Sequence, residues 1–284
     1  MLQLFEITDD MRNGLSYDGA TEKFGFSFSN VNYIAKFASQ GLTSELYSEY
    51  VASHFIAAIG VPSHDTFLGV YKGRMCVILR DFTTPAQRLR VFKHAIQSSG
   101  EMDAVYSNYT LPLIETLIAP YPAIAKRFWE MLVCDAILGN NDRHWGNWGY
   151  FSTPDGYLPA PLYDNGGALF PELSSFIEEY NKDPYLFLSS RTCKHPASQL
   201  RDAMGRRLSF NTLFHDPEVL QKTEEIRGRL TLGKIREAVT TATSGLPSPY
   251  SMVYKQLVVM RYLRIIEKRS VEEAYEESRV FDKS

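Results

Sequence analysis

Apolar and polar positions alternate in short runs along the first part of the chain, which is typical of β-strands. The segments Phe24–Ser29 and Tyr33–Phe37 are rich in aromatic residues and are separated by turn-forming residues, so they predict a β-hairpin. Two further runs, Thr66–Tyr71 and Met75–Leu79, flank the turn Lys72-Gly73-Arg74 and predict a second hairpin.

A helix is expected between these two hairpins. Thr43 or Ser44 can cap its start, and Gly60 followed by Pro62 ends it. Its apolar side is formed by residues at helical spacing, namely Leu46, Tyr50, Val51, Phe55 and Ile59.

Beyond Pro85 the apolar residues recur mainly at helical spacing. The predicted helices cover Leu111–Ile118, Ala123–Leu138, Leu230–Thr241 and Tyr254–Ile266. A third hairpin interrupts them, because two strand-like runs flank the turn Pro154-Asp155-Gly156. The charged C-terminal tail is expected to fray.

The sequence thus predicts an α+β protein. We expect a β-rich N-terminal lobe over residues 1–83 and a mainly helical C-terminal lobe over residues 84–284. A chain of 284 residues can bury a substantial core without disulfides or structural metals.

Composition and charge narrow the class of protein. The 44% of hydrophobic residues and 22% of charged residues are ordinary for a globular protein, and the net charge of -3 gives no overall attraction for nucleic acid or anionic membranes. The three cysteines Cys76, Cys134 and Cys193 are too widely separated for a zinc site or a disulfide framework. Acidic residues near the N-terminus argue against a signal peptide. We therefore expect a cytoplasmic protein, with secretion by a route without a cleaved signal left open.

Candidate chemistry is concentrated between Asn141 and Asp164. Phosphoryl transfer needs a carboxylate that orients the attacking hydroxyl, and hard oxygen ligands that hold magnesium against the triphosphate. In protein kinases the catalytic aspartate is followed five positions later by a metal-binding asparagine, and a second aspartate comes further on. Asp142, Asn147 and Asp164 reproduce this order, with the predicted third hairpin between the last two. Each residue alone could be an ordinary loop residue, whereas the ordered set predicts a kinase-type site.

Lys36 is the next candidate residue. Strand alternation places Ile34 and Lys36 on one face, so that Ile34 could pack on an adenine ring while Lys36 contacts the phosphates. A glutamate on the following helix usually holds such a lysine. Glu45 and Glu49 both fit, and Glu49 is the preferred partner; for either one the alternative is a solvated helix face.

Several neighbouring residues receive smaller roles. The loop Ser16–Lys23, with Gly19 and Ala20 at its centre, could close over the phosphates, although it lacks the repeated glycines of nucleotide-binding loops. His144 is interpreted as a hydrogen-bonding residue and not as a base, and Trp145 and Trp148 as packing residues. Cys134 is expected in the core, and Asp135 is expected to brace the loop backbone.

At this point the sequence resembles the HipA-like serine/threonine kinases of bacteria. The resemblance covers most of residues 13–170. Five ordered motifs carry it: the loop Ser16–Lys23, the strand lysine Lys36, the pattern of Glu49 with Gly60-Val61-Pro62, the segment Gly139–Asn147, and the segment Ala160–Asp164.

The resemblance implies a two-lobed, protein-kinase-like fold and a reaction that uses ATP and Mg²⁺. By this resemblance Asp142 would be the catalytic base, Asn147 and Asp164 the magnesium ligands, and Lys36 and Lys23 the phosphate contacts. Ser16 occupies a position that is autophosphorylated in some members, which switches them off.

The resemblance also implies partners. Longer members carry an additional N-terminal subdomain and act as toxins that phosphorylate an aminoacyl-tRNA synthetase and are neutralised by a DNA-binding antitoxin. This chain looks like a short member consisting of the kinase core. We therefore expect a protein substrate, such as an aminoacyl-tRNA synthetase or another translation factor, and an antitoxin as a candidate partner. No direct contact with nucleic acid or membrane is expected.

Two alternatives remain open. Phosphatidylinositol kinases also use an Asp-Arg-His-x-x-Asn loop, so the chain could be a lipid or small-molecule kinase, although no basic run near the expected cleft suggests a membrane-facing surface. The chain could also be a catalytically inert, kinase-shaped binding protein. That reading predicts the loss of at least one of four functional residues, all of which are present: Lys36, Asp142, Asn147 and Asp164.

Overall fold

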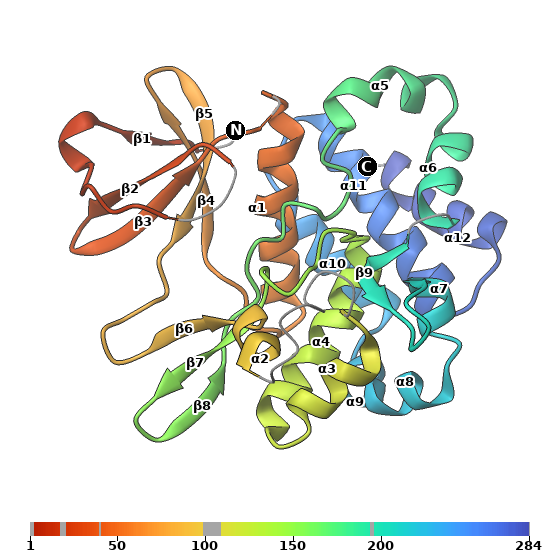
Figure 1. Ribbon diagram of the computed structural model, residues 1–284. Coiled ribbons are helices and arrows are strands. Elements are labelled where there is room, and N and C mark those ends of the chain that lie inside the picture. Colours follow the sequence, from red (N-terminus) through yellow and green to blue (C-terminus); the bar gives the residue numbers. More distant parts are fainter. Residues whose placement is uncertain (1–2, 18–20, 40, 99–108, 194–195, 284) are drawn as a thin grey trace.

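The computed structural model describes residues 3–17, 21–39, 41–98, 109–193 and 196–283. Its N-terminal part is a curled five-stranded sheet with the strand order β1-β4-β5-β3-β2, in which β1 and β4 are parallel and the other pairs are antiparallel (Figure 1). The strands are β1 (Phe5–Ile7), β2 (Lys23–Phe28), β3 (Val31–Lys36), β4 (Thr66–Tyr71) and β5 (Arg74–Arg80).

The two faces of this sheet have different surroundings. Ala35 and Phe37 lie on the outer face, in a small buried cluster with Phe26, Cys76 and Ile78. Because side chains alternate along a strand, Ile34 and Lys36 point to the opposite face. Leu68 and Val77 belong to the larger core that the sheet shares with the helices.

Helix α1 (Thr43–Ala58) lies between the sheet and the remaining helices (Figure 1). It packs against β4 and against α10 (Leu232–Ala242), so its burial joins the two parts of the chain. The prediction of a cap at Thr43 or Ser44 was wrong, because the N-cap is Leu42 and makes no side-chain cap. Ser44 is instead buried: its hydroxyl donates to the carbonyl of Pro171 at 2.5 Å and accepts from the amide of Ser174 at 3.0 Å.

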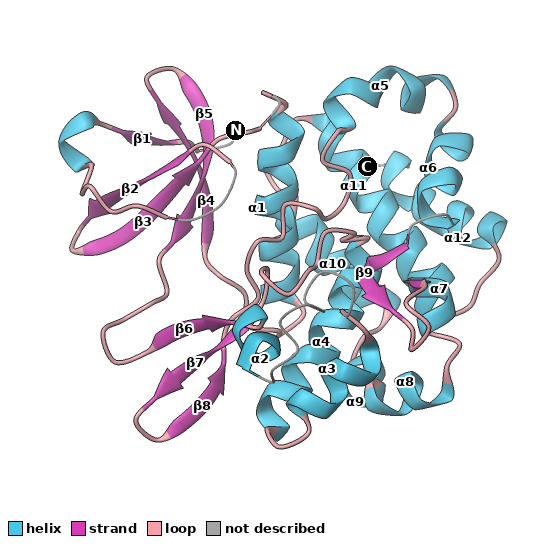
Figure 2. Cartoon of the chain, viewed as in Figure 1, coloured by secondary structure: helices cyan, strands magenta, loops and turns pink. Residues whose placement is uncertain are grey.

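Beyond β5 the chain is mainly helical (Figure 2). The helices are α2 (Lys93–Ser98), α3 (Leu111–Ile118), α4 (Pro122–Leu138), α5 (Leu173–Lys182), α6 (Pro184–Cys193), α7 (Phe210–Leu213), α8 (Pro217–Lys222), α9 (Glu224–Gly228), α11 (Ser248–Arg261) and α12 (Val271–Ser278). A π-helical turn, Tyr262–Ile266, continues α11, and short 3₁₀ helices cover Asp9–Met11 and Arg279–Lys283. Most of α4 and α11 is buried in the main core.

Two small sheets accompany these helices. One joins β6 (Arg88–Val91), β7 (Gly149–Thr153) and β8 (Gly156–Pro159), and the other pairs β9 (Pro196–Arg201) with β10 (Arg207–Ser209). The β7–β8 hairpin separates the segment that contains Asp142 from the segment that contains Asp164.

The observed elements agree with most of the predicted ones. The three predicted hairpins and the predicted helices are confirmed, most of them within two residues at their ends; the helix predicted to start at Tyr254 already begins at Ser248. The prediction of a frayed tail was wrong: Ser270 and Glu273 form a reciprocal capping box that starts α12, and Ala274 buries its side chain in the core.

The two-lobed α+β architecture expected from the sequence is confirmed, with a β-rich N-terminal part and a helical C-terminal part. A boundary at residue 83 stays a prediction. A parallel bridge between Ser63 and Leu162 also ties the connection after α1 to the segment that leads into Asp164. In the described part of the chain, no helix has the length and apolar character needed to cross a membrane.

Candidate active site

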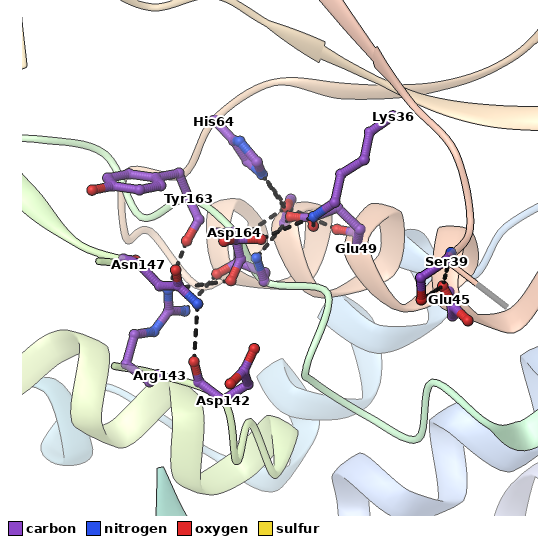
Figure 3. Close-up of polar contacts among 12 residues, drawn as sticks. Lys36, Ser39, Glu45, Glu49, His64, Asp142, Arg143, Asn147, Tyr163 and Asp164 are labelled. Carbon is purple, nitrogen blue, oxygen red and sulfur yellow. Dashed lines mark hydrogen bonds and ion pairs between the residues drawn. The ribbon is translucent and has the colours of Figure 1, made fainter. Parts of the chain in front are cut away.

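Lys36, Glu49 and Asp164 meet at the inner face of the N-terminal sheet. The ammonium of Lys36 lies 3.0 Å from Oε2 of Glu49 on α1 and 2.9 Å from Oδ1 of Asp164 (Figure 3). Residues far apart in the sequence are thereby brought together by the sheet, α1 and the segment after β8. Glu45 does not contact Lys36, because its carboxylate accepts hydrogen bonds from the amide and the hydroxyl of Ser39.

Glu49 is held in a buried network. Its Oε1 accepts the amide of Asn165 at 2.7 Å and lies 3.2 Å from Nε2 of His64. Burial alone would raise the pKa of Glu49, but Lys36 and His64 outweigh it and the pKa is lowered. Burial likewise acts to lower the pKa of Lys36, and the two facing carboxylates outweigh it, so the pKa is raised. The lysine therefore keeps its positive charge.

The loop with Asp142 and Asn147 starts where α4 ends. Gly139 ends the helix in a left-handed conformation with φ of 67°, which glycine adopts without strain. The side chain of Asn140 then accepts the amide of Asp142 at 3.1 Å, and the side-chain amide of Asn147 donates to the carbonyl of Asp142 at 2.9 Å. The backbone of Asp142 is thus held from both ends of the loop, and Asp142 itself is solvent-exposed.

Arg143 connects this loop to the segment around Asp164 through hydrogen bonds to both. Its side chain is 1% exposed and forms a two-pronged ion pair with Asp135, with Nε 3.0 Å from Oδ2 and Nη2 3.1 Å from Oδ1. It also donates to the carbonyls of Asn147 at 2.7 Å and Tyr163 at 2.6 Å, and to Oδ1 of Asn165 at 2.6 Å. Sequence reasoning missed this role, although Arg143 stands next to Asp142 in the motif.

Asp164 and the glycines after it allow the two segments to approach closely. Asp164 has φ of 53°, a left-handed conformation that aspartate tolerates better than most residues. A Cβ atom on Gly166 would lie 3.0 Å from Oε2 of Glu49, and one on Gly167 would lie 2.7 Å from Cβ of Asp142. These glycines therefore permit contacts that a larger residue would prevent.

The electrostatic surroundings suit Asp142 for proton transfer. Partial burial raises its pKa; His144 acts against this shift and the negative charge of Asp164 adds to it. A carboxylate with a raised pKa is a stronger base than an ordinary aspartate.

The side chains fit a magnesium ion that is shared with phosphates. The Asp164 side chain is 42% exposed, so its carboxylate is accessible to solvent and to a bound ion. Asn147 uses its amide nitrogen toward Asp142, which leaves its oxygen as the ligand atom. Among the residues described, no group of three or more His, Cys, Asp or Glu side chains could hold a metal. Magnesium in kinases does not need such a cage, since it takes one or two protein oxygens together with phosphates and water.

Two of the remaining predicted binding residues, Lys23 and Ile34, lie beside Lys36. Lys23 pairs in register with Lys36 on the neighbouring strand, and Ile34 is half-buried on the same face. Ser16 is exposed. Gly19 and Ala20 lie outside the described residues.

The supporting residues follow the sequence interpretation in part. Trp148 is buried, stacks on Phe92 at 4.0 Å and donates to the hydroxyl of Tyr109, which confirms its packing role. Cys134 is fully buried, and Nδ1 of His144 accepts the amide of Gly146. Asp135 braces the start of the loop as expected, because its carbonyl accepts the amide of Asn140 at 2.9 Å. Its carboxylate reaches the loop in addition through the side chains of Arg143 and Asn140.

A β-rich lobe with a paired strand lysine, set against a helical lobe with an Asp-Arg-His-x-x-Asn loop, defines a protein of the kinase-like class. The family model described as "HipA-like C-terminal domain" matches residues 15–172, more than half of the chain. The chain belongs to this family.

Known relatives agree with this assignment. The chain is 29% identical over 234 residues to the serine/threonine-protein kinase CtkA of Helicobacter pylori strain J99, an alignment that covers 76% of this chain and 72% of the relative. The crystal structure of the Helicobacter pylori proinflammatory kinase CtkA matches with a TM-score of 0.81 and 23% identity, covering 97% of this chain and 99% of that one.

A second solved structure shares the fold at greater distance. HipA of Shewanella oneidensis MR-1, solved with HipB and its operator DNA, matches with a TM-score of 0.50 and 16% identity, covering 95% of this chain and 68% of that one. The expected HipA-like family, the kinase-like fold and a phosphotransferase of the kinase class are thereby confirmed.

Proposed function

We propose that this chain is an ATP- and Mg²⁺-dependent serine/threonine protein kinase of the HipA-like type, which transfers the γ-phosphate of ATP to a protein hydroxyl. The observation that carries the proposal is the position of Lys36, 3.0 Å from Glu49 and 2.9 Å from Asp164, beside the loop that presents Asp142. A kinase needs these groups together: a lysine for the phosphates, an aspartate for the metal and an aspartate for the acceptor.

Each side chain has one task in the proposed reaction. Lys36 contacts the α- and β-phosphates, and Glu49 fixes the direction of its ammonium. Lys23, on the neighbouring strand, adds a second positive charge on the same face. Asp164 and Asn147 hold magnesium, which when bound neutralises part of the triphosphate charge. Ile34 packs against the adenine ring.

Asp142 acts on the acceptor. Its carboxylate orients the hydroxyl and accepts its proton as the bond from oxygen to phosphorus forms. The raised pKa of Asp142 favours this proton transfer, while the surrounding loop keeps the carboxylate in place through Asn140 and Asn147. The relative's name, serine/threonine-protein kinase, supports a protein acceptor over a lipid or a sugar.

The proposal also includes autophosphorylation of this chain and a role in a toxin–antitoxin pair. Ser16 is exposed on the segment before β2, so its hydroxyl is accessible for phosphorylation. The complex of HipA with HipB supports a search for an antitoxin-like partner. An aminoacyl-tRNA synthetase or another translation factor is the acceptor that the family resemblance suggests.

Nucleotide binding and transfer test the proposal separately. We expect Mg²⁺-ATP to raise the melting temperature, because a ligand that binds the folded state stabilises it. Incubation with labelled ATP and a mixture of proteins, lipids and sugars should then label protein. Label found only in lipid would support a lipid kinase instead. No thermal shift and no transfer would support an inert binding protein.

A further inference from the structure

A cavity of about 660 Å³ opens beside Asp142 on the helical side of the site. Its size lies within the usual range of ligand pockets, about 300–1,000 Å³. Its lining includes Asn141 and Asp142 together with residues that follow Asp164, among them Phe170, Glu172, Phe176 and Arg191. Because the base forms part of the wall, whatever fills this cavity lies next to the acceptor hydroxyl.

The aromatic part of the lining, Phe170 and Phe176, already binds a guanidinium. Cζ of Arg191 lies 4.9 Å from the ring centre of Phe170, 5.5 Å from that of Phe176 and 4.2 Å from that of Phe187. The rings of Phe170 and Phe176 are themselves in contact, with centres 5.4 Å apart. Aromatic faces of this kind attract cations through their negative ring faces.

The accessible charge of the cavity is negative. The guanidinium of Arg191 packs against the three rings, and its Nη2 lies 3.7 Å from Oε2 of Glu179, so that its side chain is only 21% exposed. Glu172 is exposed, and within the described part of the chain no ion pair engages its carboxylate. Glu172 and Asp142 therefore outweigh the single cation in the lining.

We propose that this cavity binds the acceptor segment and selects acceptors with an arginine or lysine close to the phosphorylated serine or threonine. The inference rests on the proposed kinase function and adds the substrate class to it. The basic side chain meets the Glu172 carboxylate, while Phe170 and Phe176 remain in contact with Arg191. Glu172 is thus a specificity-determining residue, and it takes no part in ATP binding or in proton transfer.

Two generic acceptors of opposite charge, myelin basic protein and casein, provide the test. The wild-type enzyme should phosphorylate the basic acceptor with the higher kcat/KM. Glu172→Arg should lower that kcat/KM about five- to tenfold, mainly through KM, because an attraction of the strength of an exposed ion pair becomes a repulsion. The same variant should raise kcat/KM for casein, and the KM for ATP should not change.

Glu178→Arg is the matched control. Glu178 is exposed on α5 and lies outside the cavity lining. The substitution changes the charge by the same amount as Glu172→Arg, so kcat/KM for both acceptors should stay nearly unchanged. The inference would be overturned if the two variants had equal effects or if the wild-type enzyme preferred casein. It would also be overturned if the enzyme bound ATP but phosphorylated neither acceptor. Absence of ATP binding itself would count against the proposed function instead, so the two failures are distinguishable.

Discussion

The buried ion pair between Asp135 and Arg143 is expected to hold the catalytic loop in place, and Asp135→Asn tests this directly. Both side chains are 1% exposed, and Arg143 donates in addition to the carbonyls of Asn147 and Tyr163. The substitution keeps the size of the side chain and removes its charge. Arg143 then remains buried without its acidic partner, and the loop that it binds through the Asn147 carbonyl is held less firmly.

The magnitude follows from burial. Removing one partner of a buried ion pair costs about 3–5 kcal/mol, since the remaining charge stays desolvated. The exposed pair of Arg80 and Asp65, at 3.1 Å with side chains 51% and 57% exposed, is a matched control. Asp65→Asn should cost less than about 1 kcal/mol, because solvent screens an exposed pair.

Urea unfolding of both variants, followed by circular dichroism, measures this difference in the free energy of unfolding. Transfer assays on the folded fraction should show a lower kcat for Asp135→Asn and an unchanged kcat for Asp65→Asn. Equal stability of the two variants, or full activity of Asp135→Asn despite a large loss of stability, would refute the role given to this pair.

Three further predictions concern the site itself. Glu49→Gln should weaken ATP binding and cost about 1–3 kcal/mol of stability, because the new NH2 group must face another donor, either the Lys36 ammonium or the Asn165 amide. Calorimetry measures ATP binding and urea unfolding measures stability; normal ATP affinity would contradict this prediction. The pKa of Asp142 is raised, so kcat/KM should fall on the acid side at a pH above the ordinary aspartate value of about 3.9 as the base becomes protonated; a pH profile at saturating ATP checks this. Gly167→Ala should lower kcat about 100-fold with little change in melting temperature, because the new Cβ would lie 2.7 Å from Cβ of Asp142 and displace that side chain. An unchanged kcat would show that the loop can shift without loss of activity.

Local patterns in the sequence determine much of the fold. The β2–β3 hairpin and α1 follow from alternation, turn residues and the helix-ending Gly60, all of which act over a few residues. The order of Asp142, Asn147 and Asp164 likewise pointed to one site, because the β7–β8 hairpin returns the chain between them. These features could be predicted because they depend on neighbours in sequence.

Other features depend on contacts between distant segments. Glu45 and Glu49 lie four residues apart on one face of α1, so the sequence could not decide between them by helical spacing alone. The position of β3 along the axis of α1 brings Lys36 to Glu49, while Glu45 meets Ser39. Ser44 looked like a helix cap and instead binds the segment before α5. Helices α5 and α6 were missed because their serine-rich sequence is only weakly helical, and they gain stability from packing on α11.

The central claim is that Lys36, Asp142, Asn147 and Asp164 form one site for phosphoryl transfer. Mass spectrometry of a protein acceptor after incubation with Mg²⁺-ATP, combined with calorimetric ATP binding, tests it most directly in the wild type and in Asp142→Asn. The account predicts that the variant binds ATP with nearly unchanged affinity and adds no phosphate to the acceptor. Phosphate transfer by Asp142→Asn at the wild-type rate would contradict it.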